Sequence, residues 1–214
     1  MEMYLQERDQ RLKDRDESRS GAKRRFLGSV EKMGGQKLFG ELKTALNLME
    51  SIDYNHPGLS KKQYLAHPYR VAKLALEELR PFDIRAVRLA LVHNILEMAN
   101  IDECLVRDVL GFNMLGELKV LTVIRADEST AYRARYYDGI YASEPHVRKV
   151  KVLDKMDNMY TLNLHPDLDV RSRYLNEIKK YVRPIVEKDF NDMLRYFDGL
   201  VSFCEDTEPF DPLD

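Results

Sequence analysis

The sequence has few of the features that mark secreted, membrane-spanning or nucleic-acid-binding proteins. Its 214 residues include only two cysteines, Cys104 and Cys204, too few for a disulfide framework, which predicts free thiols in a reducing compartment. It has no run of about 18 apolar residues and no apolar signal segment behind the initiator Met, so no membrane span is expected. The formal net charge of −2 gives no electrostatic reason to expect bulk nucleic-acid binding. These absences favour a cytoplasmic soluble protein.

The composition suits one helical domain with an N-terminal appendage. The chain is 44% hydrophobic and 33% charged, so it can bury a core and stay solvated. Residues 1–25 carry dense charge of both signs, which predicts a solvated helix or mobile arm broken at Gly21. We therefore predict a charged arm or helix over 1–35, a helical domain over 36–204 and a tail over 205–214.

Apolar residues recur at helical spacing from about residue 36 onward, and no strand pair or internal repeat is evident. The last segment contains Pro184, where we expect a kink. The pattern predicts an all-α, compact multi-helix bundle. Its expected helices cover roughly residues 36–52, 68–79, 83–99, 101–110, 115–126, 131–141, 146–163 and 169–204.

Two adjacent polar residues, His93 and Asn94, interrupt the apolar run of the expected helix 83–99. Buried polar side chains need a hydrogen bond or a metal ion. Glu97 lies four residues after His93, and Asp154 and Asn158 are spaced alike, so each pair shares a helix face. Two such faces, with His67 at a helix start, could converge on Zn, Mn or Fe. Spacing alone leaves open that these are satisfied core residues.

Three short motifs in this sequence resemble those of a known protein family. They read Tyr64-Leu-Ala-His67-Pro68, then His93-Asn94-Ile-Leu-Glu97-Met98, then Val152-Leu-Asp154-Lys155-Met-Asp-Asn158. In order and interval they resemble the HD superfamily of metal-dependent phosphohydrolases, and most closely the hydrolase domain of RelA/SpoT proteins and small alarmone hydrolases. The resemblance spans roughly residues 36–200. It implies an all-α HD-domain bundle that hydrolyses a nucleotide-like substrate, with guanosine tetra- or pentaphosphate as the alarmone candidate.

The same resemblance implies a role for each matching residue. A divalent ion, expected to be Mn²⁺, would be held by the ligands His67, His93, Asn94 and Asp154. Glu97 would position or activate the attacking water, and Asn158 would hold the phosphate end or the water network. Lys155 and, by a looser match, Arg173 would contact the substrate.

Two positions depart from the family pattern. Asn94 stands where the family has a metal-binding Asp, and Met98 stands where it has an acid after Glu97. An Asn carbonyl can bind a metal ion but brings no charge. Three functions therefore stay open: a working phosphohydrolase, a catalytically degenerate protein that binds a nucleotide or protein partner in a regulatory role, and a purely structural domain. The oligomeric state also stays open.

Two further groups of residues have simpler interpretations. Tyr132, Tyr136 and Tyr137 lie at helical spacing among arginines, which favours core and rim positions over base stacking. For Lys149 and Lys151, beside the Asp154 motif, an exposed helix face is favoured over a phosphate contact.

Overall fold

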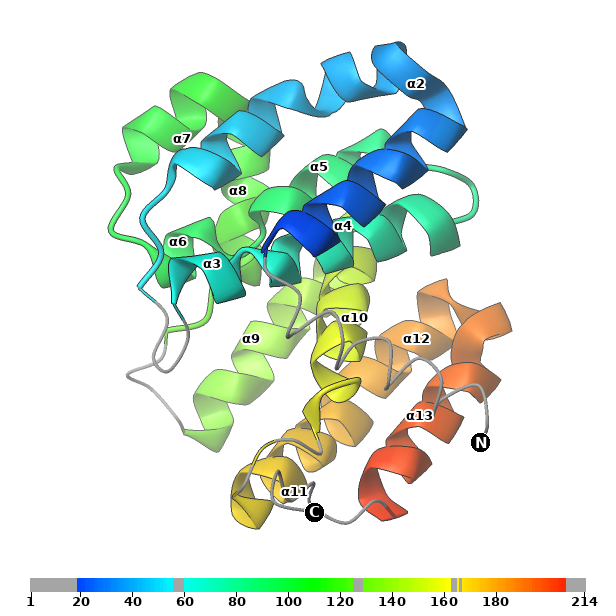
Figure 1. Cartoon of the computed structure of the whole chain (residues 1–214). Coiled ribbons are helices and arrows are strands. Elements are labelled where there is room, and N and C mark those ends of the chain that lie inside the picture. The colour runs from blue at the N-terminus through cyan, green and yellow to red at the C-terminus, as the bar shows by residue number, and fades with distance from the viewer. Residues whose placement is uncertain (1–18, 56–59, 125–128, 163–164, 166, 207–214) are drawn as a thin grey trace.

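The chain is described by a computed structural model that covers residues 19–55, 60–124, 129–162, 165 and 167–206 (Figure 1). These residues form helices and no strand, which confirms the all-α prediction. Among them, no helix combines the length and apolar character needed to cross a bilayer. Residues 1–18 and 207–214 lie outside the described part, so the predicted arm and tail remain predictions there.

The first described helix, α2 (Arg19–Ser51), consists of two helical stretches joined by a kink at Gly35, whose φ of 53° and ψ of −140° are not helical. The stretch after the kink confirms the helix expected from about residue 36 to 52, and the stretch before it begins at Arg19. Gly21 does not break it. Ala22, Phe26 and Val30 repeat every four residues and are almost fully buried, so this face packs into the core rather than being solvated. The many charged residues around these three made their apolar spacing difficult to recognise in the sequence. The division of the chain into domains stays a prediction, but residues 19–35 are part of the packed helical body.

The later helices follow the expected order along the chain. Their bounds are α3 (Lys61–Tyr64), α4 (Ala66–Glu78), α5 (Ile84–Val92), α6 (Ile95–Met98), α7 (Glu103–Leu110), α8 (Phe112–Leu121), α9 (Thr130–Ala142), α10 (Pro145–Met159), α11 (Leu168–Glu177), α12 (Arg183–Asp189) and α13 (Leu194–Asp206). The expected helix 169–204 is thus several pieces. A π-helical turn, η2 (Ile178–Val182), precedes Pro184, and a short 3₁₀ turn, η3 (Asn191–Met193), precedes α13. Pro184 has no N–H to donate to the preceding turn, which explains the irregularity there.

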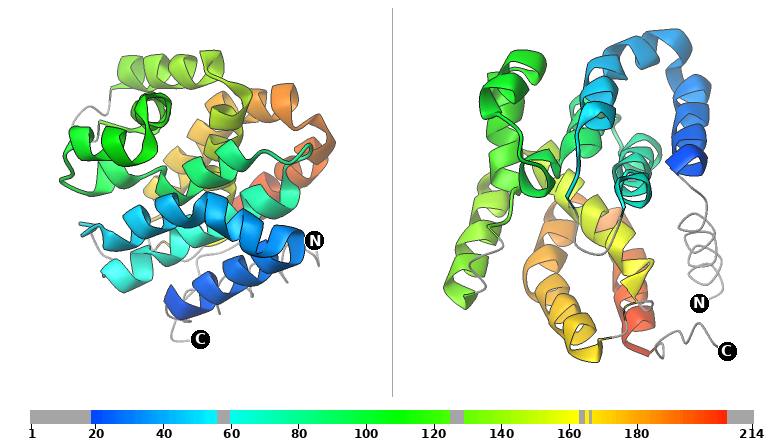
Figure 2. Two further views of the ribbon diagram at one scale, coloured as in Figure 1. Left: turned by 90° about the horizontal axis from the view of Figure 1, so that it is seen from above. Right: turned by 60° about the vertical axis from the view of Figure 1, so that its left-hand side comes forward.

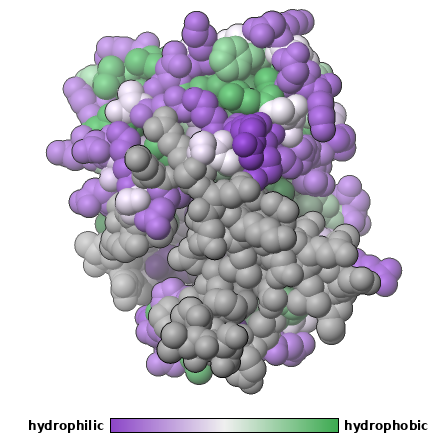
Figure 3. Space-filling model, in the orientation of Figure 1, coloured by the Kyte–Doolittle hydropathy of each residue, from purple (hydrophilic) through white to green (hydrophobic). Residues whose placement is uncertain are grey.

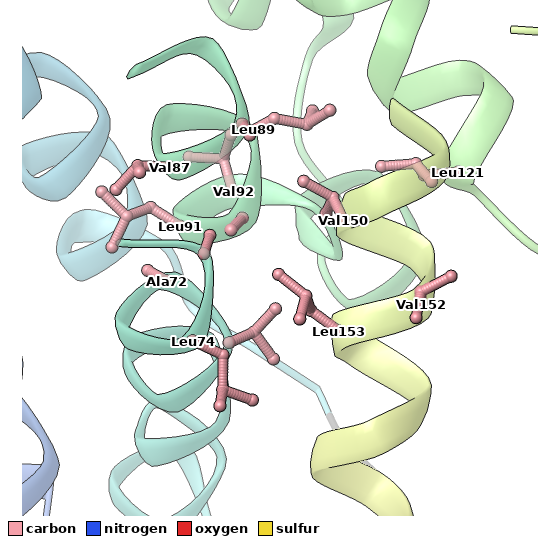
Figure 4. Packing of buried hydrophobic residues seen from close by; sticks show 14 of the residues in the cluster. Ala72, Leu74, Val87, Leu89, Leu91, Val92, Leu121, Val150, Val152 and Leu153 are labelled. Carbon is pink, nitrogen blue, oxygen red and sulfur yellow. The ribbon is translucent and has the colours of Figure 1, made fainter. Parts of the chain in front are cut away.

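Helix α10 runs through the middle of the molecule and connects its two halves (Figures 1 and 2). It packs against α4 and α5 on one side and against α12 and η2 on the other. Val150 and Leu153 point from α10 toward α4 and α5 and are fully buried (Figure 4). This apolar contact fixes the three helices that carry His67, His93 and Asp154 at short range.

The expected helix 83–99 is interrupted at the polar pair. α5 ends at Val92, and Asn94 adopts φ −107° and ψ 6° before α6 begins at Ile95. The Nδ1–H of His93 donates to the carbonyl of Ala90, which a continuous helix would offer to the N–H of Asn94. The break therefore comes from the same polar side chain that marks the site.

The surface of the described residues is of mixed polarity. Figure 3 shows hydrophilic residues predominating on the upper part of one face, with hydrophobic residues between them. The large hydrophobic residues that are exposed include Leu105 of α7 and Phe112 of α8. Exposed apolar residues of this kind are normal and assign no function by themselves.

Candidate metal centre

Three of the predicted ligands come together between α4, α5 and α10. The Nε2 atoms of His67 and His93 lie 3.2 Å apart, and the Oδ1 atom of Asp154 lies 3.2 Å from the first and 3.6 Å from the second. All three side chains are largely buried. Residues separated by up to 87 positions therefore present one ligand atom each to a common point.

Each imidazole is oriented by a hydrogen bond on its other nitrogen. Nδ1 of His67 lies 2.8 Å from Oδ2 of Asp157, and Nδ1 of His93 lies 2.7 Å from the carbonyl oxygen of Ala90. Both partners are acceptors, so both Nδ1 atoms carry the proton and both Nε2 atoms present lone pairs. Two lone pairs and a carboxylate oxygen that face one another require a cation between them.

The spacing fits a single transition-metal ion. Ligand distances of about 2.0–2.2 Å, with angles of about 90–110° at the metal, place ligand atoms roughly 2.8–3.6 Å apart. The three distances among His67, His93 and Asp154 are 3.2, 3.2 and 3.6 Å. Imidazole nitrogen with carboxylate oxygen is also a donor set that suits Mn, Fe or Zn. Geometry and chemistry of the donors thus agree on a divalent ion.

Without a metal ion, Asp154 and Asp157 favour a second proton on the His67 ring. Burial alone would lower the pKa of His67, but its hydrogen bonds with Asp154 and Asp157 outweigh burial and raise that pKa to about 9. A metal ion bound at Nε2 would displace this proton.

Asp154 is held as a carboxylate. Its Oδ2 accepts from Nζ of Lys151 at 3.1 Å, and its Oδ1 accepts from Nδ2 of Asn158 at 3.2 Å. Burial favours the neutral acid, but the charge of Lys151 and the interactions with His67 and His93 keep the pKa of Asp154 well below its ordinary range. Lys151 is itself only 5% exposed. The expectation of an exposed face was therefore wrong for this lysine.

Tyr64 lies beside His67 and interacts with Asn94 and Glu97. The ring of Tyr64 lies 6.2 Å from that of His67. Burial raises the pKa of Tyr64 well above 10; a hydrogen bond with Asn94 opposes the rise, and the charges of Asp154 and Glu97 add to it. The phenol is therefore neutral. Asn94 is the residue before α6, but its side chain makes no capping hydrogen bond to that helix.

Met98 is buried in the core. Its side chain is 6% exposed, and its carbonyl accepts the N–H of Asn55 at 2.7 Å.

The two predicted substrate residues differ in their surroundings. Lys155 is buried, pairs with Glu177 at 3.1 Å and lies 4.7 Å from the centre of the Tyr174 ring. Burial would lower the pKa of Lys155, but the electrostatic interactions with Tyr174 and Glu177 outweigh burial and raise the pKa, so the side chain is a cation. Arg173 is exposed, and its Nε donates to the carbonyl of Asp169 one turn earlier on α11. Both substrate roles stay predictions.

Sequence reasoning missed Asp157, Arg70 and Glu177. Asp157 is three residues after Asp154, and Arg70 is three residues after His67, so each shares a helix face with a predicted ligand. That spacing was a usable signal. Glu177 carried no local signal, since its partners Lys155, Tyr137 and Arg133 lie on other helices.

Comparison with known proteins identifies the fold. No family model and no curated protein sequence matches the chain. Among solved structures, it is similar to a metazoan ortholog of SpoT that hydrolyses ppGpp and plays a role in starvation responses. The match has a TM-score of 0.61 and 18% sequence identity, and covers 78% of this chain and 94% of that one. The chain therefore shares the all-α fold of that structure, in agreement with the fold that the resemblance of the three motifs implied.

Proposed function

We propose that this protein is a cytoplasmic, metal-dependent phosphohydrolase that acts on a nucleotide-like substrate. The observation that carries the proposal is the convergence of Nε2 of His67, Nε2 of His93 and Oδ1 of Asp154, with both Nδ1 atoms already occupied. The fold similarity to a ppGpp hydrolase supports guanosine tetra- or pentaphosphate as the first substrate to test.

The charges around the cluster favour an anionic substrate once a divalent ion is present. Opposite charges are matched in the site: Lys151 with Asp154, Arg70 with Asp157, and both Lys155 and Arg133 with Glu177. Glu97 brings the number of carboxylates to four, equal to the four cations. A divalent ion would leave this region with an excess of two positive charges, which suits a phosphate ester or anhydride.

The ligands support Mn²⁺ as the ion. Carboxylate and carbonyl oxygens are preferred by hard cations such as Mn²⁺, and imidazole also accepts it. The amide oxygen of Asn94 would serve as the fourth donor, beside His67, His93 and Asp154. When bound, such an ion supplies Lewis acidity and lowers the pKa of water.

The remaining residues would transfer the proton and bind the phosphate. Glu97 would accept a proton from the attacking water at its carboxylate, and the water oxygen would form a bond to phosphorus as the phosphate–oxygen bond to the leaving group breaks. Asn158 would keep Asp154 oriented through its bond to Oδ1 and would help to hold the phosphate end, and Lys155 would stabilise the developing charge. Arg173 would bind the outer part of the substrate.

A second function is favoured by Asn94 and Met98. An uncharged fourth ligand and a buried thioether in place of an acid weaken the catalytic arrangement while they leave the helical scaffold intact. The alternative is a catalytically degenerate HD-domain protein that binds a nucleotide or protein partner in a regulatory role.

One experiment separates the two. The purified protein is loaded with Mn²⁺ and assayed for phosphate or pyrophosphate release from a panel of nucleoside polyphosphates that includes ppGpp. Turnover that His93→Ala abolishes supports the enzyme. Binding of a nucleotide without turnover supports the regulator, and the absence of turnover and of nucleotide binding overturns the proposed function.

A further inference from the structure

Beyond its three ligands, the centre contains a buried carboxylate that binds no ion in the proposed scheme. The side chain of Asp157 is fully buried on α10, and its Oδ2 lies 2.8 Å from Nδ1 of His67. Asp157 comes one helical turn after Asp154, so α10 supplies one ligand and also the acceptor that orients a second ligand.

Arg70 holds this carboxylate from α4. Its Nε donates to Oδ1 of Asp157 at 2.9 Å, and its Nη2 donates to Oδ2 at 2.8 Å. This two-point contact fixes both the position and the plane of the carboxylate. His67 lies three residues before Arg70 on α4, so the two helices are joined twice, once through the ligand and once through the guanidinium.

We propose that Asp157, oriented by Arg70, positions His67 for metal binding. The inference rests on the proposed metal centre and adds to it two positioning residues that touch neither ion nor substrate. The carboxylate keeps the proton of His67 on Nδ1 and turns Nε2 toward Asp154 and His93. Hydrogen-bond partners of this kind commonly contribute about 10–100-fold to metal affinity.

The pairing also explains why a second acid can be buried so close to Asp154. Two carboxylates one helical turn apart would repel each other in a buried site. The guanidinium of Arg70 balances Asp157, and Lys151 balances Asp154, so each acid has its own cation. Removal of Arg70 would leave Asp157 uncompensated and would loosen the acceptor that His67 depends on.

The chain offers a matched control for the test. Arg148 and Asp189 form another largely buried arginine–carboxylate pair on α10 and α12, with Nη2 of Arg148 2.9 Å from Oδ1 of Asp189. It joins the same central helix but contacts none of the three ligands. The variants are therefore Asp157→Asn, Asp157→Ala and Arg70→Gln, with Asp189→Asn and Asp189→Ala as controls and His67→Ala as the reference for a lost ligand.

The first measurement is Mn²⁺ affinity in the full-length protein, by electron paramagnetic resonance of the free ion. We expect Asp157→Ala to weaken affinity about 10–100-fold and Asp157→Asn and Arg70→Gln to weaken it about tenfold. The Asp189 variants are expected to stay within about twofold of the parent, since a purely structural loss does not reach the ligands. If Asp157→Ala does not fold, the isosteric Asp157→Asn carries the test.

The second measurement does not need a metal ion. Long-range ¹⁵N–¹H spectra of the metal-free protein at alkaline pH report which ring nitrogen of His67 carries the proton. We expect Nδ1–H in the parent and a shift toward Nε2–H in Asp157→Ala. Unchanged tautomer and affinity in folded Asp157 variants would overturn the inference. Failure of the parent to bind Mn²⁺, with the Nδ1–H tautomer present, would overturn the proposed function but leave the positioning role supported.

Discussion

Nε2 of His67 and Nε2 of His93 lie 3.2 Å apart, although 26 residues separate the two side chains along the chain. Each ring donates its Nδ1 proton elsewhere, so two lone pairs face each other beside the carboxylate of Asp154. Such an arrangement is unfavourable unless a proton or a metal ion lies between the donors. The rest of the proposed chemistry depends on a metal ion at this position.

Restoring the missing acid should strengthen the centre. Asn94→Asp adds a charged ligand beside His93, and we expect it to raise Mn²⁺ affinity by about tenfold or more, the reverse of losing a ligand contact. Isothermal titration of the metal-free protein measures the change. Asn100→Asp, which adds the same charge at an exposed position, should leave the affinity unchanged. Equal gains in both variants would point to a general charge effect and against a ligand at Asn94.

Combining this change with Met98→Asp tests whether the protein is a degenerate enzyme. Met98 is 6% exposed, so an acid there has a desolvation cost unless the site uses it. If the parent lacks turnover, we expect the double variant to release phosphate or pyrophosphate from ppGpp. An inactive double variant that binds Mn²⁺ tightly would contradict the idea that these two positions alone remove activity.

Glu97 should affect catalysis and not ion binding. Glu97→Gln removes the group that would accept a proton from water, and we expect turnover to fall about 10²–10⁴-fold while Mn²⁺ affinity stays within a few-fold. Steady-state rates with saturating Mn²⁺ measure the loss. The control is Glu103→Gln on α7, whose exposed carboxylate pairs with Lys119. Equal rates in Glu97→Gln and the parent would exclude Glu97 as the base.

Glu177 should make stability depend on pH. Burial would raise its pKa, but Lys155, Tyr137 and Arg133 outweigh burial and lower the pKa below its ordinary 4.5. A lowered pKa in the folded state stabilises the fold above the unfolded pKa, and this contribution disappears as pH falls through the folded value. We therefore expect Glu177→Gln to cost roughly 3 kcal/mol at neutral pH and progressively less in acid.

Urea unfolding at a series of pH values measures this difference. Glu187, which forms an exposed i,i+4 pair with Arg183, supplies the control. Glu187→Gln should cost no more than about 0.5 kcal/mol at any pH, because solvent screens exposed pairs. A pH-independent cost for Glu177→Gln would indicate lost packing instead of lost charge.

The kink in α2 should depend on glycine. Gly35 has φ 53° and ψ −140°, a conformation that residues with a Cβ rarely adopt. We expect Gly35→Ala to destabilise the protein by about 1–3 kcal/mol. Gly116 in α8 has helical surroundings with open space for a Cβ, and Gly116→Ala should stabilise by about 0.5–1 kcal/mol. Thermal unfolding of both variants checks the opposite signs.

The helical fold and the convergence of His67, His93 and Asp154 could be predicted from sequence because both leave local signals. Apolar spacing marks the helices, and the Asp154 motif places Asp154 and Asn158 on one face of α10. His93 and Glu97 were expected to share a helix face as well, but the break between α5 and α6 separates them. The resemblance to a family, which rests on the order and spacing of the three motifs, linked these residues to one site. None of these signals describes contacts between helices, which is why Asp157 and Arg70 went unnoticed although each lies one turn from a predicted ligand.

Other features depended on packing that sequence periodicity does not report. The helical stretch of α2 before Gly35 packs through three buried residues, Ala22, Phe26 and Val30, within a highly charged part of the sequence. The break before Asn94 arises because the His93 ring takes a backbone acceptor. Burial of Lys151 depends on Asp154 as its partner, and a sequence gives no indication that a lysine of this kind is inside.

The most direct test of the metal centre is the ion content of the protein after Mn²⁺ loading and removal of free ion. Elemental analysis is made on the parent and on His67→Ala, His93→Ala and Asp154→Ala, each shown by circular dichroism to be folded. We predict about one Mn²⁺ per chain in the parent and a large loss in each variant. A parent that retains no ion, or variants that retain as much as the parent, would contradict a metal centre at these three residues.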